Sequence, residues 1–245
     1  MRIILPIITI ILFLSCEKSE DRSCFKAVGG ETNKEIPLSS FNQLYLGPHL
    51  KYVLIQSDEE KVVLNGGKNL LNFIETTVEG GKLSIRNKNQ CNFLRSYDKM
   101  VTVHVYLKDV INVLFEGTHE LNCFNTLNIG NLTFVIRDGA GAVDLDLNAQ
   151  SLHLIVTHGW GNFTLRGQVE YLDMEINSNG FGSTYNMNVL DSLNVKSNTS
   201  ELVKVNANNC SFRAQTLSSG DIWYIGVPSF LEFYGYGSGN LIDKN

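Results

Sequence analysis

The sequence predicts an all-β fold, a right-handed parallel β-helix (β-solenoid) with about 20 residues per coil. The main observation is a set of apolar residues spaced 20, 20, 21, 19 and 19 residues apart: Leu132, Leu152, Leu172, Leu193, Phe212 and Leu231. Each opens a run that alternates apolar and polar residues, which indicates a strand with one buried face. A composition with 21 glycines, four prolines and few apolar residues at helical spacing also favours an all-β chain.

The clearest repeat has a strand at residues 132–136, a corner at residues 138–141 and a second strand at residues 143–147. Its corner, Asp-Gly-Ala-Gly, predicts backbone conformations that a Cβ would forbid. The repeat length is nearly constant, and the second connection lacks the Asn-Gly or Asp-Gly pairs of two-residue hairpins. Parallel coils are therefore favoured over a meander, and the crossover rule predicts right-handed winding.

The same register places opposite charges side by side on the outer surface. If the leucines stack inward, Glu175 lies between Ile155 and Lys196, and Asp146 lies beside Arg166. Exposed cross-strand pairs contribute about 0.2–1 kcal/mol each, so they tune the register. The stacked Leu, Val, Ile and Phe columns are expected to supply the stability.

A single domain is predicted over residues 38–245, because no Pro/Ser linker interrupts the chain after residue 40. Its first coils, to about residue 109, have longer and more polar connections, whereas the coils over residues 110–245 are regular. Alternating segments predict the early strands, at residues 41–46, 52–55, 83–85, 101–107 and 111–115.

The N-terminus predicts export. Arg2 precedes an apolar stretch over residues 3–14, which is too short to cross about 30 Å of hydrocarbon. With Cys16 after a small residue, it resembles a secretory signal that ends in a bacterial lipobox, although Phe13 replaces the usual leucine. The resemblance implies a signal peptide over residues 1–15 and lipidation of Cys16. The alternative is that Cys16 is an ordinary thiol.

Residues 16–37 are predicted to form a polar tether. Its Ser19-Glu20-Asp21 resembles a surface-export signal of Bacteroidetes lipoproteins, although any solvated tether can be acidic. The expected location is the cell envelope, as an outer-membrane lipoprotein that is surface-exposed or faces the periplasm. The net charge of -5 comes without a basic stripe, which argues against a nucleic-acid partner.

The cysteines suggest neither a metal site nor a cofactor. Four of them lie beyond Cys16, in an exported chain where disulfides can form: Cys24, Cys91, Cys123 and Cys210. They allow three connectivities. Cys123 and Cys210 should lie about four coils apart, too far for a bridge that needs α-carbons within about 7 Å. Cys24 with Cys91 is the least implausible pair. No CxxC motif or Cys/His spacing points to a metal ion.

Candidate catalytic groups are sparse. Asp144 and Asp146 share one strand face and could hold a cation, as the acidic clefts of solenoid polysaccharide lyases do. A solvated strand face explains them better, because Arg166 is predicted beside Asp146 and no third carboxylate joins them. Three histidines are scattered and lack a serine or cysteine at triad-like positions: His104, His153 and His158. A non-catalytic protein is therefore expected.

The corners carry two large aromatic residues where small ones would suffice. Trp160 and Phe181, flanked by His158 and Asn179, are predicted to stack on adjacent coils. Exposed rings there could bind a sugar or a partner protein. The alternative is that both rings fold back over the end of the core.

Four segments carry a family resemblance: Phe41-x-x-Leu44, residues 67–71 and 77–85, and Gly237-Ser238-Gly239-Asn240. Together they resemble the putative autotransporter adhesin head GIN domain family, which is widespread among Bacteroidetes lipoproteins. The family's Gly-Ser-Gly corner is replaced by Gly-Ala-Gly, Gly-Trp-Gly and Gly-Phe-Gly in the repeats. The resemblance, over residues 38–245, implies a β-solenoid and an adhesin label, and it brings no catalytic residues.

These features lead to a preferred hypothesis: a lipid-anchored envelope protein whose solenoid binds a glycan or protein without catalysis. One alternative is a carbohydrate-active enzyme, a polysaccharide lyase or hydrolase, with an acidic groove. Another is a purely structural or signalling envelope component. Ser192, within Asp191-Ser192-Leu193, also matches the short O-glycosylation pattern of Bacteroidetes.

Overall fold

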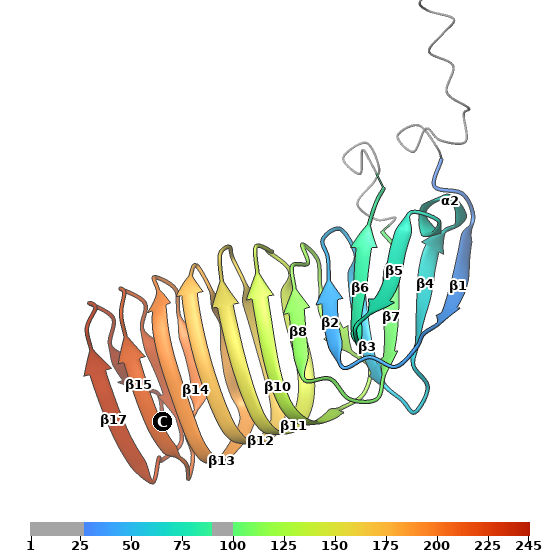
Figure 1. The fold of residues 1–245 in the computed structure, drawn as a ribbon. Coiled ribbons are helices and arrows are strands. Elements are labelled where there is room, and N and C mark those ends of the chain that lie inside the picture. Colours follow the sequence, from blue (N-terminus) through green and yellow to red (C-terminus); the bar gives the residue numbers. More distant parts are fainter. Residues whose placement is uncertain (1–26, 90–99) are drawn as a thin grey trace, which may run out of the picture.

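The computed structural model describes residues 27–89 and 100–245. Of these residues, 65% lie in strands and 2% in a helix, so the all-β prediction is confirmed. The chain winds into about seven stacked coils roughly 20 residues apart, which form a β-solenoid (Figure 1). The lipidation candidate Cys16, the predicted signal peptide, and Cys24 and Cys91 lie outside the described residues.

Each coil contributes one strand to each of two long sides. The first side contains six strands: β2 (Gln43–Leu46), β6 (Lys82–Asn87), β8 (Asn112–Phe115), β10 (Leu127–Arg137), β15 (Ser211–Thr216) and β17 (Phe230–Gly235). The second side contains another six: β3 (Lys51–Gln56), β7 (Thr102–Leu107), β9 (Leu121–Cys123), β14 (Val203–Asn206), β16 (Ile222–Ile225) and β18 (Leu241–Asp243). Three long strands run through a corner and serve both sides: β11 (Ala142–Thr157), β12 (Asn162–Ser178) and β13 (Phe181–Thr199). All strand pairs within these two sides are parallel.

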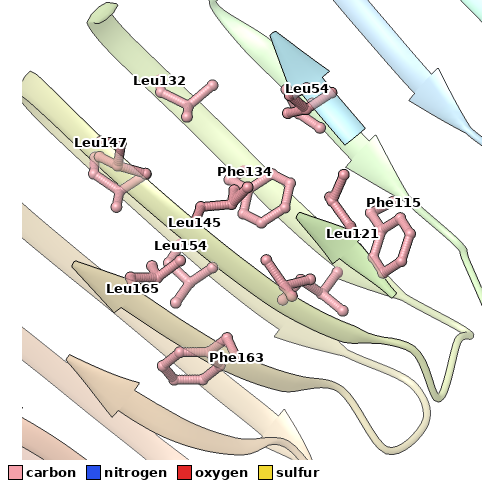
Figure 2. Packing of buried hydrophobic residues seen from close by; sticks show 14 of the residues in the cluster. Leu54, Phe115, Leu121, Leu132, Phe134, Leu145, Leu147, Leu154, Phe163 and Leu165 are labelled. Carbon is pink, nitrogen blue, oxygen red and sulfur yellow. The ribbon is translucent and has the colours of Figure 1, made fainter. Parts of the chain in front are cut away.

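The predicted apolar column is confirmed residue by residue. Its members are successive partners in the parallel register: Leu132, Leu152, Leu172, Leu193, Phe212 and Leu231. Side chains from both sides, Phe134 and Leu145 among them, fill the space between them (Figure 2). Phe163 and Phe212 are fully buried in the same core. Since burial of such a side chain contributes about 1.5–3 kcal/mol, these columns are the main source of stability.

The predicted outer ladders also have the expected register. Glu175 pairs with Ile155 on one side and with Lys196 on the other, and Asp146 pairs with Arg166. The ion pair of Arg166, however, is diagonal, because its Nη2 lies 2.5 Å from Oδ1 of Asp144.

The first coils are not stacked in sequence order. Strands β6 and β7 form a coil that lies beyond β2 and β3, whereas β8 and β9 stack on the opposite edges of β2 and β3. The chain therefore forms the coil of β2 and β3 first and then stacks β6 and β7 on its N-terminal side. It then crosses to the opposite side of β2 and β3, where it forms β8 and β9. Ile111 lies in this crossing, where its N–H donates to the Asn42 carbonyl over 2.9 Å. It is exposed, so its predicted inward position is wrong, while Val113 and Phe115 are buried as predicted.

The N-terminal end of the solenoid is closed by antiparallel strands. On the second side, β4 (Lys61–Gly67) pairs antiparallel with β7, and β1 (Glu31–Pro37) pairs antiparallel with β4. On the first side, β5 (Ile74–Glu79) pairs antiparallel with β6, and α2 (Lys68–Leu71) packs Leu70 and Leu71 into the core. Strand β1 falls within the predicted tether, so the predicted domain start at residue 38 is later than the first strand.

The predicted role of the corner glycines is confirmed only in part: Gly159 has a φ of 116°, which residues with a Cβ rarely adopt, but Gly139 and Gly141 have no such φ. The left-handed backbone is adopted by non-glycine residues before them, with φ of 56° at Asp138 and 52° at His158. Gly139 and Gly141 instead face the preceding coil. A Cβ added at Gly139 would lie 2.2 Å from the Gly117 oxygen, and one added at Gly141 would lie 2.1 Å from the His119 oxygen. These glycines allow neighbouring corners to approach closely.

Candidate functional site

Trp160 is an exposed aromatic residue at the corner between β11 and β12. Its side chain is 56% exposed, which rules out the alternative that this ring folds back over the core. The corner is held by its neighbours: the Trp160 N–H donates to the Gly139 oxygen, and the His158 N–H donates to Oγ of Ser178 over 3.3 Å. His158 itself is exposed, and its Nδ1 lies 2.9 Å from Oγ1 of Thr157. The indole ring is thus presented to solvent by a fixed backbone.

Phe181 does not lie at the position equivalent to Trp160. It is the first residue of β13 and pairs with Asn162 in the register. Four residues connect β11 to β12, but only two connect β12 to β13, so the corner around Asn179 is shorter. None of the aromatic ring contacts of the described residues joins Trp160 to Phe181. The predicted stack of two aromatic rings at successive corners is therefore wrong.

Phe181 instead lines a groove of about 290 Å³ on the second side, next to the corner. The lining residues come from three successive coils: Asn162, Phe163, Thr164, Phe181, Gly182, Ser183, Glu201, Leu202 and Lys204. Amide, hydroxyl, carboxylate and ammonium groups thus surround one partly exposed ring. Trp160 does not line the groove, but it precedes Asn162 by two residues, and the Phe181 N–H donates to the oxygen of the adjacent Gly161 over 3.0 Å. We call Trp160, Asn162, Phe181, Glu201 and Lys204 the corner surface.

The two remaining candidate residues support the corner rather than line the groove. Asn179 is partly buried, and its N–H donates to the Gly159 oxygen over 3.3 Å. His158 has the left-handed backbone that turns the chain. The structure therefore brings Trp160 and Phe181 onto one surface but leaves His158 and Asn179 at its edge.

Asp144 and Asp146 do not form an open acidic cleft. The ion pair between Asp144 and Arg166 supports the interpretation of this strand face as a solvated surface. Among residues 27–89 and 100–245, no group of three or more His, Cys, Asp or Glu side chains could hold a metal ion. His104 is occupied elsewhere, since its Nδ1 lies 3.1 Å from Nδ2 of Asn65.

A second groove, on the first side, was not found from the sequence. It has a volume of about 390 Å³ and is lined by residues of β11, β12, β13 and β15, of which all but the buried Met174 and Val195 face outward: His153, Asp173, Met174, Glu175, Asn194, Val195, Lys196, Arg213 and Gln215. Several of its polar side chains already have partners in the protein: Asn194 donates to Asp173 over 2.7 Å, and Arg213 pairs with Glu232 at 2.7 Å. The 19- to 21-residue spacing of these outward positions was the signal that could have revealed it.

Apart from the two grooves, a cluster of polar side chains connects coils on the first side. The Tyr45 hydroxyl donates to Oε2 of Glu116 over 2.7 Å, and Nε of Arg137 donates to Oε1 over 2.8 Å. The Arg86 guanidinium lies 4.6 Å from the centre of the Tyr45 ring. Burial raises the pKa of Glu116, but the hydrogen bonds from Tyr45 and Arg137 outweigh it, so the pKa is lowered. Every group here has a partner within the cluster, which indicates a structural role.

Within residues 27–89 and 100–245, Cys123 and Cys210 are free thiols and do not pair with each other. Burial raises the pKa of both. In the part of the chain that the structure describes, no helix has the length and apolar character needed to span a bilayer.

Comparisons with known proteins agree with this architecture. The model of the family "Putative auto-transporter adhesin, head GIN domain" matches residues 40–228. A putative adhesin from Bacteroides fragilis is similar in structure, with a TM-score of 0.77 and 19% identity, covering 88% of this chain and 97% of that one. No curated protein matches the chain.

Two structures from Parabacteroides distasonis share the fold. One is a putative adhesin with a TM-score of 0.65 and 19% identity, covering 88% of this chain and 98% of that one. The other is a putative lipid binding protein with a TM-score of 0.58 and 19% identity, covering 87% and 97%. At these identities the likeness concerns the fold alone.

Proposed function

This chain belongs to the putative auto-transporter adhesin, head GIN domain family, and we propose that it is a lipid-anchored envelope protein that binds a ligand without catalysis. The ligand is a glycan or a protein, and it binds at the corner surface. The parts of the proposal are a signal peptide over residues 1–15, an anchor at Cys16 and a single binding domain. The observation that carries the binding role is the exposed indole of Trp160 in the turn that leads into the strand lining the groove at Phe181.

The chemistry of the corner surface suits such a ligand. Aromatic faces bind apolar surfaces, including those of sugar rings, and polar groups around them fix the orientation. Here Asn162, Glu201 and Lys204 supply an amide, a carboxylate and an ammonium group around Phe181. The parallel coils already hold these side chains in place, so little conformational entropy is lost when a ligand binds.

Binding can be tested on the protein that lacks residues 1–16, with a glycan array and a pull-down from envelope extracts. We expect a ligand whose binding falls in both Trp160→Ala and Phe181→Ala. Phe124→Ala is the matched control, because this ring is 78% exposed but lies on another part of the solenoid. A ligand that binds all three variants equally would contradict the proposed surface, as would the absence of any ligand.

Anchoring and location are tested in cells. The Cys16→Ser variant should lose its lipid and leave the membrane fraction, whereas Cys123→Ser should remain there. Protease treatment of intact cells should degrade the native protein if it is on the outer surface. Retention of Cys16→Ser in the membrane would contradict lipid anchoring.

The non-catalytic assignment is supported by the ion pair of Asp144, which occupies one of the two carboxylates that an acidic cleft would need. The competing enzyme hypothesis predicts release of reducing sugars from acidic polysaccharides in the presence of calcium. It also predicts that Asp144→Ala combined with Asp146→Ala abolishes this release. Both results together would replace the binding proposal.

A further inference from the structure

The two ends of the solenoid differ in how their core is covered. Strands β1 and β5 close the N-terminal end, whereas β17 and β18 lie at the opposite end (Figure 1). Among the described residues, β17 pairs only with β15, and β18 pairs only with β16. Their outer edges therefore present unpaired backbone N–H and C=O groups, which can template pairing with another strand.

The core columns are uncovered at this end. Leu231 stacks on Phe212 and Phe233 stacks on Ala214, and both of these partners are fully buried. Leu231 and Phe233 themselves are 43% and 40% exposed. The terminal units of repeat proteins usually carry a polar outer face, so this coil has the composition of an internal one.

Further apolar rings surround the same edge. Phe230, Tyr234 and Tyr236 are all exposed, and the rings of the two tyrosines stack at 6.2 Å. With Phe233, these rings expose about 400 Å² per copy, given about 150–250 Å² for a whole aromatic side chain. This is about half of the roughly 800 Å² that each partner buries in a standard interface. The aliphatic side chains and strand edges of the same end can add to that area.

We propose that two copies of this chain associate end to end through β17, with a two-fold axis that makes the two β17 strands antiparallel neighbours. The N-terminal end also has open strand edges, but its outermost strand β1 (ETNKEIP) is polar and exposed, so it does not match an apolar end in head-to-tail stacking, and the contact is between identical ends. Such a contact closes on itself as a dimer and does not propagate into a fibre. The two solenoids then form one continuous rod with the closed ends outermost.

Charge placement selects the register of this pairing. When two β17 strands pair, inward residues must lie opposite inward residues. The residue that lies opposite its own copy, at the centre of the pair, can therefore be Glu232 or Phe233. Centring on Glu232 would place two carboxylates opposite each other, which is unfavourable. Centring on Phe233 pairs Phe233 with its own copy and places Glu232 opposite Tyr234. Glu232 is already neutralised by Arg213 at 2.7 Å, so its burial near the edge is tolerated.

Cysteine cross-linking of the full chain in cells tests the proposal. Phe233→Cys should give a covalent dimer under mild oxidation, because the two new thiols face each other. Tyr171→Cys, an exposed residue in the middle of the solenoid, is the matched control and should give no more dimer than the unsubstituted chain. A Phe233→Cys chain that stays monomeric although its thiol is alkylated by a maleimide would overturn the proposal.

A second measurement does not depend on the new thiol. The full chain, purified in detergent, should have twice the monomer mass by sedimentation. Phe233→Lys should reduce it to a monomer with an unchanged circular dichroism spectrum, whereas Phe124→Lys should remain a dimer. A monomeric unsubstituted chain, a longer oligomer, or a Phe233→Lys variant that stays dimeric would each overturn it.

Discussion

Replacing Gly141 by alanine tests how closely neighbouring corners approach. The added Cβ would lie 2.1 Å from the His119 oxygen and 2.9 Å from the Gly117 oxygen. Both atoms belong to the backbone of the preceding coil, so neither can rotate away. Gly141 has no left-handed φ, and the cost is therefore steric alone. Overpacking of this kind costs about 1–3 kcal/mol.

For a domain of this size, that loss corresponds to a fall in Tm of roughly 2–12 °C, measured by circular dichroism. Gly130→Ala is the matched control, because an added Cβ there meets nothing within 4 Å. It should leave the Tm unchanged or raise it slightly, since alanine restricts the unfolded chain. The reasoning would be refuted if Gly141→Ala were as stable as Gly130→Ala.

Three further predictions follow from burial and charge. Phe163→Ala empties a fully buried site and should lower the free energy of unfolding in urea by about 3–5 kcal/mol. Phe124→Ala, at an exposed ring, should change it by less than about 0.5 kcal/mol, and equal effects would contradict the core assignment. Because the folded-state pKa of Glu116 is lowered, its stabilisation is complete above the unfolded pKa of 4.5 and is lost as the pH falls through the folded value. Melting curves from pH 7 to pH 3 should therefore fall less steeply for Glu116→Gln, and an equal slope would argue against the cluster. Iodoacetamide should leave Cys210 unmodified in the native protein and modify it in urea, as peptide mass mapping can show, and modification of the native protein would contradict its burial.

The regular coils could be predicted closely because their signal is local and repeated. Period-two alternation identified the inward residues of each strand, and the 20-residue spacing identified which of them stack. Leu152 and Leu172 are therefore partners in the structure as expected. The first coils could not be ordered in this way. Alternation marks β6 and β7 as strands, but it does not say on which edge of β2 and β3 they pair.

The candidate site was predicted in composition but not in geometry. Trp160 was expected to be at a corner, and it is exposed there. The shared Gly-x-Gly pattern aligns Phe181 with Trp160, but in the register Phe181 lies opposite Asn162, two residues later. The repeat pattern does not point to Glu201 and Lys204 as site residues, because they reach the groove only through the stacking of a later coil.

The all-β class, the coil length and the inward columns follow from the residues alone, since all three depend on side-chain patterns that recur along the chain. The order of the first coils, the antiparallel closure of one end and the uncovered core of the other arise from contacts between coils that are distant in sequence. The alternation of apolar and polar residues within a strand shows which of its faces is buried. The backbone N–H and C=O groups along its two edges, by contrast, are nearly the same for every sequence. Which edge pairs with which strand depends on the coils around it.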